Sequence, residues 1–128
     1  MKTLIITNNP KVEKEFGGTE NVAFYPEADQ SEILRRARDL IHLGAELIMH
    51  PMAGRVKPHE TPYKSVFLIE KTGAVHLMSF TIIEDSISET NKFLTGGMRK
   101  KYDDSLLPDL QFIDLELLRS GIEEYKRA

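Results

Sequence analysis

Residues 21–49 hold a predicted helix between two short apolar runs, and this order most constrains how the chain can fold. Apolar residues at the spacing of one buried helical face occur at Ile33, Leu34, Ala37, Leu40 and Ile41. Asp29 and Glu32 stand at capping-box spacing, and Gly44 follows as a stop signal, so we predict a helix over 30–43. NVAFY (21–25) and AELIM (45–49) flank this helix as strands. A strand–helix–strand order of this length indicates a right-handed crossover between parallel strands.

Further strands are predicted from apolar and β-branched runs that end at turn residues. TLIIT (3–7) is expected to be a buried strand that stops at Asn8, and 11–20 a loop or a short helical turn. SVFLIE (65–70) and GAVHLMSF (73–80) are expected to pair as a hairpin, because the short connection between them contains Gly73.

Two more helices complete the predicted fold. Thr81 and Glu84 stand at capping-box spacing and Gly96-Gly97 would end that helix; a mixed-charge linker is expected over 97–109, and a last helix from about Asp114. Its apolar face comprises Leu115, Leu118, Ile122 and Tyr125. The sum predicts one α/β domain over 1–128, with a mixed, mostly parallel sheet of about five strands flanked by three helices.

Composition excludes several classes of function. The formal net charge of −3 argues against a dedicated nucleic-acid binder, which presents a basic surface. We expect no membrane span, because no apolar run approaches about 18 residues, and the N-terminus lacks the features of a signal peptide. The expected location is therefore the cytoplasm. The chain has no cysteine, so disulfides, thiol catalysis and cysteine-based metal centres are excluded.

The segment HPMAGRVKPHETPYKS (50–65) is the strongest candidate for function. It is a long polar connection between two strand-like runs, and long loops in small domains are usually functional or disordered. Its prolines restrict the backbone, so we interpret it as a shaped binding loop. If the strands at 3–7 and 45–49 are parallel neighbours, their ends open on the same edge of the sheet, where ligands of α/β proteins bind.

Side chains from both strand ends would then form one ligand site. The predicted ligand-binding residues are Asn8, Asn9, His50, Arg55, Lys57, His59, Glu60, Tyr63 and Lys64. Guanidinium, ammonium and amide groups together suit a small anionic or zwitterionic ligand. The simpler alternative is that the asparagines and prolines only form turns, and that Glu60 and Lys64 are solvated.

Catalysis and metal binding have weaker support in the sequence. Glu60 and His50 are candidates for proton transfer, provided that burial brings their pKa values toward neutrality. The four histidines lack the i, i+4 or HxH spacing of common metal sites, and glycine-rich phosphate loops are missing. We therefore predict neither a metal site nor a cofactor. Whether the protein is an enzyme stays open.

Three segments carry a resemblance to a known family. LIITNNP (4–10), GAELIMHPMAGRVKPHETPYKSV (44–66) and QFIDLELLRSGI (111–122) together resemble the GrdX family, small proteins associated with glycine, sarcosine and betaine reductase systems of amino-acid-fermenting anaerobes. The resemblance implies a cytoplasmic accessory protein of such a selenium-dependent system. It implies no activity that can be assigned to individual residues.

Two hypotheses about function remain. The first is a non-catalytic accessory protein that uses the 50–64 loop to bind a small anionic metabolite or a subunit of the reductase complex. The second is a small enzyme acting on an amino-acid-derived or acyl phosphate substrate, with Arg55, Lys57 and Lys64 on the anion. A purely structural subunit is a third option. Apolar residues off the predicted core faces, such as Phe16 and Phe93, leave a homodimer open.

Overall fold

A four-stranded mixed sheet lies at the centre of the structure, a computed structural model that describes residues 2–96 and 100–128. The strands are β1 (Thr3–Thr7), β2 (Val22–Phe24), β3 (Glu46–Leu47) and β4 (Ser65–Ile69). Their order is β2-β1-β4-β3, with β1 parallel to β2 and with β4 antiparallel to β1 and β3. The first three strands therefore run in one direction. Their carboxyl ends share one edge of the sheet with the amino end of β4.

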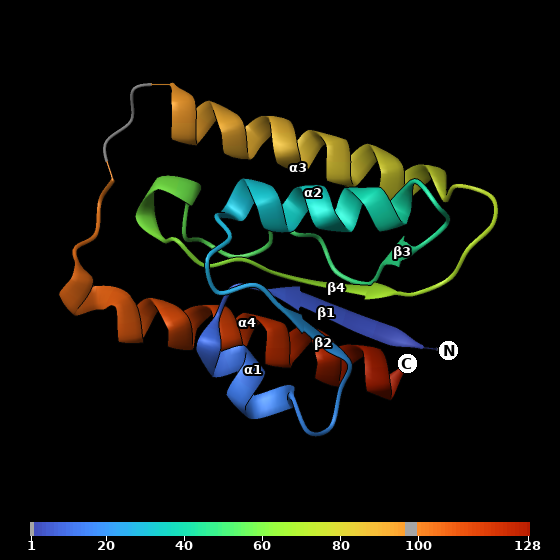
Figure 1. The fold of residues 1–128 in the computed structure, drawn as a ribbon, viewed down its shortest axis with the longest axis horizontal. Helices are drawn as coiled ribbons and strands as arrows, with labels where there is room; N and C mark the ends of the chain where they lie inside the picture. The colour runs from blue at the N-terminus through green and yellow to red at the C-terminus, as the bar shows by residue number, and fades with distance from the viewer. Residues whose placement is uncertain (1, 97–99) are drawn as a thin grey trace.

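Helices cover both faces of this sheet, which makes three layers (Figure 1). The described α-helices are α1 (Pro10–Phe16), α2 (Gln30–Ile41), α3 (Leu77–Thr95) and α4 (Leu107–Arg127), and the 3-10 turns are η1 (Pro58–Glu60) and η2 (Asp104–Leu106). α2 and α3 lie on one face, whereas α1 and α4 lie on the other. Successive strand residues point to opposite faces, so Ile6 packs in the α2–α3 core and Ile5 in the α1–α4 core.

The helix predicted between the apolar runs is confirmed at Gln30–Ile41. Its N-cap is Asp29, whose side chain accepts a hydrogen bond from the Glu32 amide at 2.8 Å. The predicted stripe is buried apart from Leu40, which is partly buried. Local spacing predicted this element well because the cap and the apolar face lie within a single stretch of chain.

The predicted hairpin of 65–70 with 73–80 is wrong. β4 forms, but the chain then leaves the sheet, and His76 caps α3 with its Nδ1, which accepts from the Ser79 amide. Gly73 donates its amide to the Leu43 carbonyl, and a Cβ on Gly44 would lie 2.6 Å from the Gly73 nitrogen. This close backbone contact takes the chain to the α2 face, where α3 begins four residues before the predicted cap at Thr81.

The described sheet differs from the prediction in size and order. It is mixed as predicted, but it has four strands, and only one of its three pairs is parallel. β1 and β3 run in the same direction without being neighbours, because β4 lies between them. Four consecutive buried residues in β4 fit this central position, since a central strand is covered on both faces.

Helix boundaries account for the remaining differences. The segment predicted as a loop or short helical turn at 11–20 contains α1, which adds a fourth α-helix to the three predicted. The last helix begins at Leu107, seven residues before the predicted Asp114. Residues 104–109 of the predicted linker over 97–109 are thus a 3-10 turn and the start of α4, whereas 97–99 lie outside the described residues.

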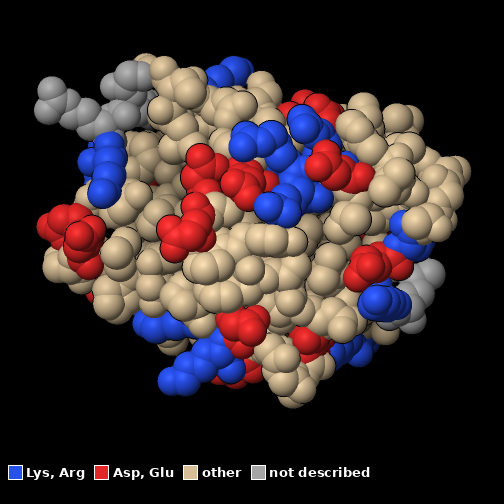
Figure 2. All heavy atoms as spheres, in the orientation of Figure 1, with Lys and Arg blue, Asp and Glu red and all other residues tan. Residues whose placement is uncertain are grey.

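Charges of both signs are interspersed over the face of the molecule in Figure 2. Dedicated nucleic-acid binding calls instead for a clustered basic patch or stripe. Among the helices of the described residues, none combines the length and apolar character needed to cross a bilayer.

Candidate functional site

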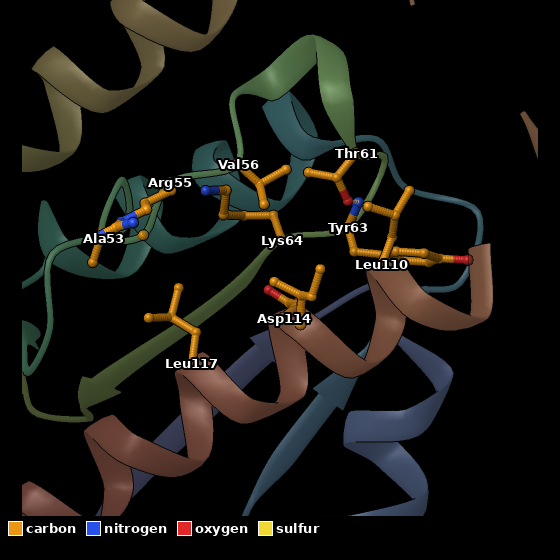
Figure 3. A pocket seen from close by; sticks show the side chains of 11 residues that line it. Ala53, Arg55, Val56, Thr61, Tyr63, Lys64, Leu110, Asp114 and Leu117 are labelled. Carbon is orange, nitrogen blue, oxygen red and sulfur yellow. Dashed lines mark hydrogen bonds between the residues drawn. The ribbon is translucent and has the colours of Figure 1, made fainter. Parts of the chain in front are cut away.

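A cavity of about 100 Å³ opens between the 50–64 loop and α4, at the edge of the sheet where β4 begins. We call it the loop–helix cavity. Its walls come from loop residues 53–56, 61, 63 and 64 and from α4 residues 110, 113, 114 and 117 (Figure 3). The loop lies close against the helix at Gly54. A Cβ built on this residue would lie only 3.1 Å from Leu117 Cδ2, and its φ of 100° is one that other residues rarely adopt. Two ionisable side chains of opposite sign, Lys64 and Asp114, line this cavity.

Asp114 is held in place by side chains just beyond the end of β1 and at the start of β4. Its Oδ2 accepts hydrogen bonds from Asn9 Nδ2 at 2.9 Å and from the Ser65 hydroxyl at 2.7 Å. Ser65 in turn shares a 2.7 Å hydrogen bond with Thr7, so the network connects the ends of β1 and β4 to α4. Burial raises the pKa of the Asp114 carboxyl, while these hydrogen bonds and the charge of Lys64 partly oppose the shift.

Lys64 brings a half-buried amine to the same cavity. Its Nζ donates a 2.6 Å hydrogen bond to the Pro51 carbonyl and lies 4.0 Å from Met52 Sδ. Burial lowers the pKa of this amine, and the Asp114 charge only partly offsets that effect. Among the described residues, no carboxylate oxygen lies within 4.0 Å of Lys64 Nζ. The ammonium charge is thus incompletely compensated by the protein.

Replacing Asp114 with asparagine is expected to raise the free energy of unfolding at pH 7. The variant keeps an oxygen for the Asn9 and Ser65 hydrogen bonds, but it removes the cost of ionising a buried carboxyl. The pKa of Asp114 is higher in the folded protein than in the unfolded chain. The stability that the protonated carboxyl contributes is therefore fully present at a pH below the unfolded-state pKa, and it is lost as the pH rises through the folded-state pKa. The advantage of the variant should therefore shrink as pH falls toward about 4.

Urea unfolding of both proteins between pH 4 and pH 8 measures this difference. The matched control is Asp109→Asn, in the exposed first turn of the same helix. An Asp114→Asn advantage that stays constant across this pH range would show that the carboxyl does not titrate differently in the folded and unfolded states.

The two predicted asparagines are positioned by backbone contacts at the end of β1. Asn8 is buried, and its amide donates to the carbonyls of Ala28 and Pro62, both at 2.9 Å, while its oxygen accepts from the Lys64 amide at 3.0 Å. Asn9 caps α1 by accepting from the Lys11 amide, and its Nδ2 donates to the Gln111 carbonyl as well as to Asp114. Both side chains therefore hold the loop and α4 against the sheet.

Of the other predicted site residues, three reach this cavity and one lies beside it. Arg55, Tyr63 and Lys64 line the cavity, with Arg55 exposed and the Tyr63 hydroxyl accepting from Gln111 Nε2 at 2.7 Å. His50 lines a much smaller space that also borders Lys64 and Asp114, and its Nδ1 accepts from the Met52 amide.

The last three predicted residues lie away from the cavity. Glu60 Oε1 accepts from the Lys57 amide at 2.8 Å, so the carboxylate caps η1, and the Lys57 side chain is exposed. His59 is buried and stacks on Phe93, with ring centroids 5.2 Å apart. Its Nδ1 has no hydrogen-bond partner among the described residues.

A second, larger groove opens at the same edge of the sheet. It has a volume of about 420 Å³ and is bordered by Asn8, Gln30, Pro58 and residues 61–63, among others. Both side-chain amides in this groove already donate to backbone carbonyls: Asn8 to those of Ala28 and Pro62, and Gln30 to those of Pro58 and Thr61. We therefore regard the smaller loop–helix cavity as the better candidate site, because it holds two half-buried ionisable groups whose pKa values are shifted by desolvation.

Asp114 is not among the site residues predicted from the sequence. The sequence predicts a last helix that starts at about Asp114, whereas α4 begins about two turns earlier, at Leu107. A signal was present, because Asp114 lies one turn before the buried Leu118 and so falls within the apolar face. A carboxylate on a buried helical face calls for partners, which are here supplied by Asn9 and Ser65.

Comparison with known proteins places the chain in a family. No curated protein and no solved structure matches the chain. A family model described as GrdX-like protein matches residues 4–123, a span that includes both walls of the loop–helix cavity. The chain therefore belongs to the GrdX-like protein family.

Proposed function

We propose that this GrdX-like protein is an accessory protein of a glycine, sarcosine or betaine reductase system and binds a small anionic metabolite in the loop–helix cavity. The single observation that supports binding is the state of Lys64, a half-buried amine paired with a backbone carbonyl and not with a carboxylate. An anion that enters the cavity would compensate this charge. Arg55, exposed beside it, offers a second cation. The reductase context comes from the family resemblance alone.

Catalysis by the predicted proton-transfer residues has less support than binding. Glu60 caps η1 and is absent from the walls of the cavity within the described residues. His50 borders only the small neighbouring space and already accepts a backbone hydrogen bond. The enzyme hypothesis for an amino-acid-derived or acyl phosphate substrate therefore remains an alternative.

The 50–64 loop could instead bind a subunit of the reductase through its exposed part. Protein docking and metabolite binding would then depend on different side chains. Partner docking would depend on exposed side chains such as Lys57, whereas metabolite binding would depend on Lys64, which is half-buried in the cavity wall.

Replacing Lys64 with methionine is expected to weaken binding of acetate, phosphate or acetyl phosphate by at least about tenfold. A hydrogen bond to a charged group contributes about 1.5–3 kcal/mol, and about 1.4 kcal/mol corresponds to a tenfold change in affinity. Methionine keeps much of the length of the side chain, so the walls of the cavity should stay in place. Isothermal titration at low salt measures the affinity, and thermal stabilisation by millimolar anion gives an independent readout.

Lys57→Met is the matched control, because Lys57 belongs to the same loop but its exposed side chain does not line the cavity. It should change anion affinity by less than about twofold, within the small range expected for an exposed charge. Equal losses in the two variants would indicate non-specific attraction to a basic loop. If none of the three anions binds the unmodified protein, the proposed anion site is wrong.

A further inference from the structure

Opposite charges face one cavity from two different elements of the fold. Lys64 comes from the end of the loop next to β4, whereas Asp114 comes from the middle of α4 (Figure 3). The walls between and around them are largely apolar, with Val56, Leu110 and Leu117 among them. A ligand in this cavity would therefore meet the Lys64 ammonium and the Asp114 carboxylate, with the exposed Arg55 as a second cation in the wall, in largely apolar surroundings where charges interact strongly.

Lys64 and Asp114 do not neutralise each other in a direct ion pair. The two groups do not form an ion pair within 4.0 Å, and the groups that hydrogen-bond Asp114 are neutral: the side chain of Asn9, and the side chain and backbone of Ser65. Both side-chain bonds end on Oδ2, although the carboxylate has two oxygens that accept. Oδ1 accepts no side-chain hydrogen bond within the described residues, so it is the oxygen that Asp114 offers to a ligand.

We propose that the loop–helix cavity binds a small zwitterion, with the anionic group of the ligand on Lys64 and its cationic group on Asp114. This inference rests on the proposed anion site and adds the second half of the ligand. A cationic group would replace the hydration that burial removes from the Asp114 carboxylate, as the anionic group does for Lys64.

Asp114 would also act against unsuitable ligands. A simple carboxylate or phosphate satisfies Lys64 but leaves the Asp114 carboxyl without a cation, and an anion with charges at both ends meets it with repulsion. The cavity of about 100 Å³ restricts the ligand to a small molecule. Specificity for zwitterions would thus come from one residue of α4, not from the loop cations alone.

The experiment compares ligands that differ only by an amino group. Glycine, β-alanine and γ-aminobutyrate are titrated into the full chain at pH 7 and low salt, each beside the carboxylic acid of equal carbon number and the corresponding amine. At least one amino acid is expected to bind ten times more tightly than its matched acid. The best chain length then reports the span between Lys64 and Asp114. This comparison needs no variant, so it does not depend on the folding of a mutant.

Asp114→Asn supplies the second arm, with Asp109→Asn on the exposed surface of α4 as its matched control. The variant should retain binding of the simple acid but reduce the advantage of the amino acid to less than twofold, while the control keeps it. Acids that bind the unmodified protein as tightly as the amino acids would overturn the zwitterion site and leave the anion site intact. Failure of every ligand, acids included, would overturn the zwitterion site and the proposed function together.

Discussion

Replacing Phe67 with alanine is expected to lower the free energy of unfolding by about 3–5 kcal/mol, the usual range for a buried phenylalanine. Phe67 is 1% exposed and lies in the middle of β4, between β1 and β3. Its ring packs in the α1–α4 core and meets Tyr125 edge to face, with centroids 5.7 Å apart. Truncation would remove this contact and leave a cavity beneath α4. Equilibrium urea unfolding measures the loss.

Phe112→Ala provides the matched control, because Phe112 is 55% exposed on α4. Its removal should change the free energy of unfolding by no more than about 0.5 kcal/mol. A loss below about 1.5 kcal/mol for Phe67→Ala would be far under the range for a buried aromatic residue. Such a result would contradict the central position of β4 and the packing of α4 on it.

Replacing Asn8 with alanine is expected to cost about 3 kcal/mol and to loosen the 50–64 loop. The Asn8 side chain makes three hydrogen bonds, all to backbone groups, at Ala28, Pro62 and Lys64. Each such bond contributes about 0.5–1.5 kcal/mol, and a buried backbone group left without a partner costs about 1–3 kcal/mol. Urea unfolding measures the total, and hydrogen exchange of the Lys64 amide reports the local effect.

The control for Asn8 is Asn21→Ala, since Asn21 is exposed and donates a single hydrogen bond, to the Thr3 carbonyl at 3.1 Å. Its effect should stay within about 0.5 kcal/mol. If Asn8→Ala cost no more than this control, and the Lys64 amide kept its protection, Asn8 would not hold the loop. The simpler interpretation of Asn8 as a turn former would then be preferred over its role in positioning Lys64.

Elements specified by neighbouring residues were predicted most reliably from the sequence. The helix Gln30–Ile41 is one example, because the Asp29 cap and the apolar stripe lie within one short stretch. The first strand and the strand at 65–69 were also predicted, since each is a compact run of apolar residues. Membership of the GrdX-like family was likewise apparent from segments of the sequence.

Prediction failed where a local pattern suits two structures. Residues 73–80 contain alternating apolar positions that favour a strand, yet they lead into α3. Leu77 and Met78, which a strand would bury in part, are 75% and 67% exposed at the helix start. The outcome depends on the contact of Gly73 with Gly44, which a local pattern does not contain.

In the candidate site, too, some residues were predicted correctly from the sequence and others were not. Arg55, Tyr63 and Lys64 were predicted as site residues from the composition of one loop, and they line the cavity. Glu60 was predicted for its charge, but its carboxylate caps η1. Whether a charged side chain faces a cavity, a backbone amide or solvent depends on packing, so composition alone cannot distinguish these cases.

The α/β class, the capped helix α2, the apolar strands and the loop rich in cationic groups can all be inferred from the amino-acid sequence. These features follow from side-chain periodicity and caps, which act over a few residues. The position of β4 between β1 and β3, and that of Asp114 facing Lys64 across a cavity, depend on how separate elements pack. The hydrogen bond from Asn9 to Asp114 joins positions 105 residues apart, and such contacts form only when separate elements pack together.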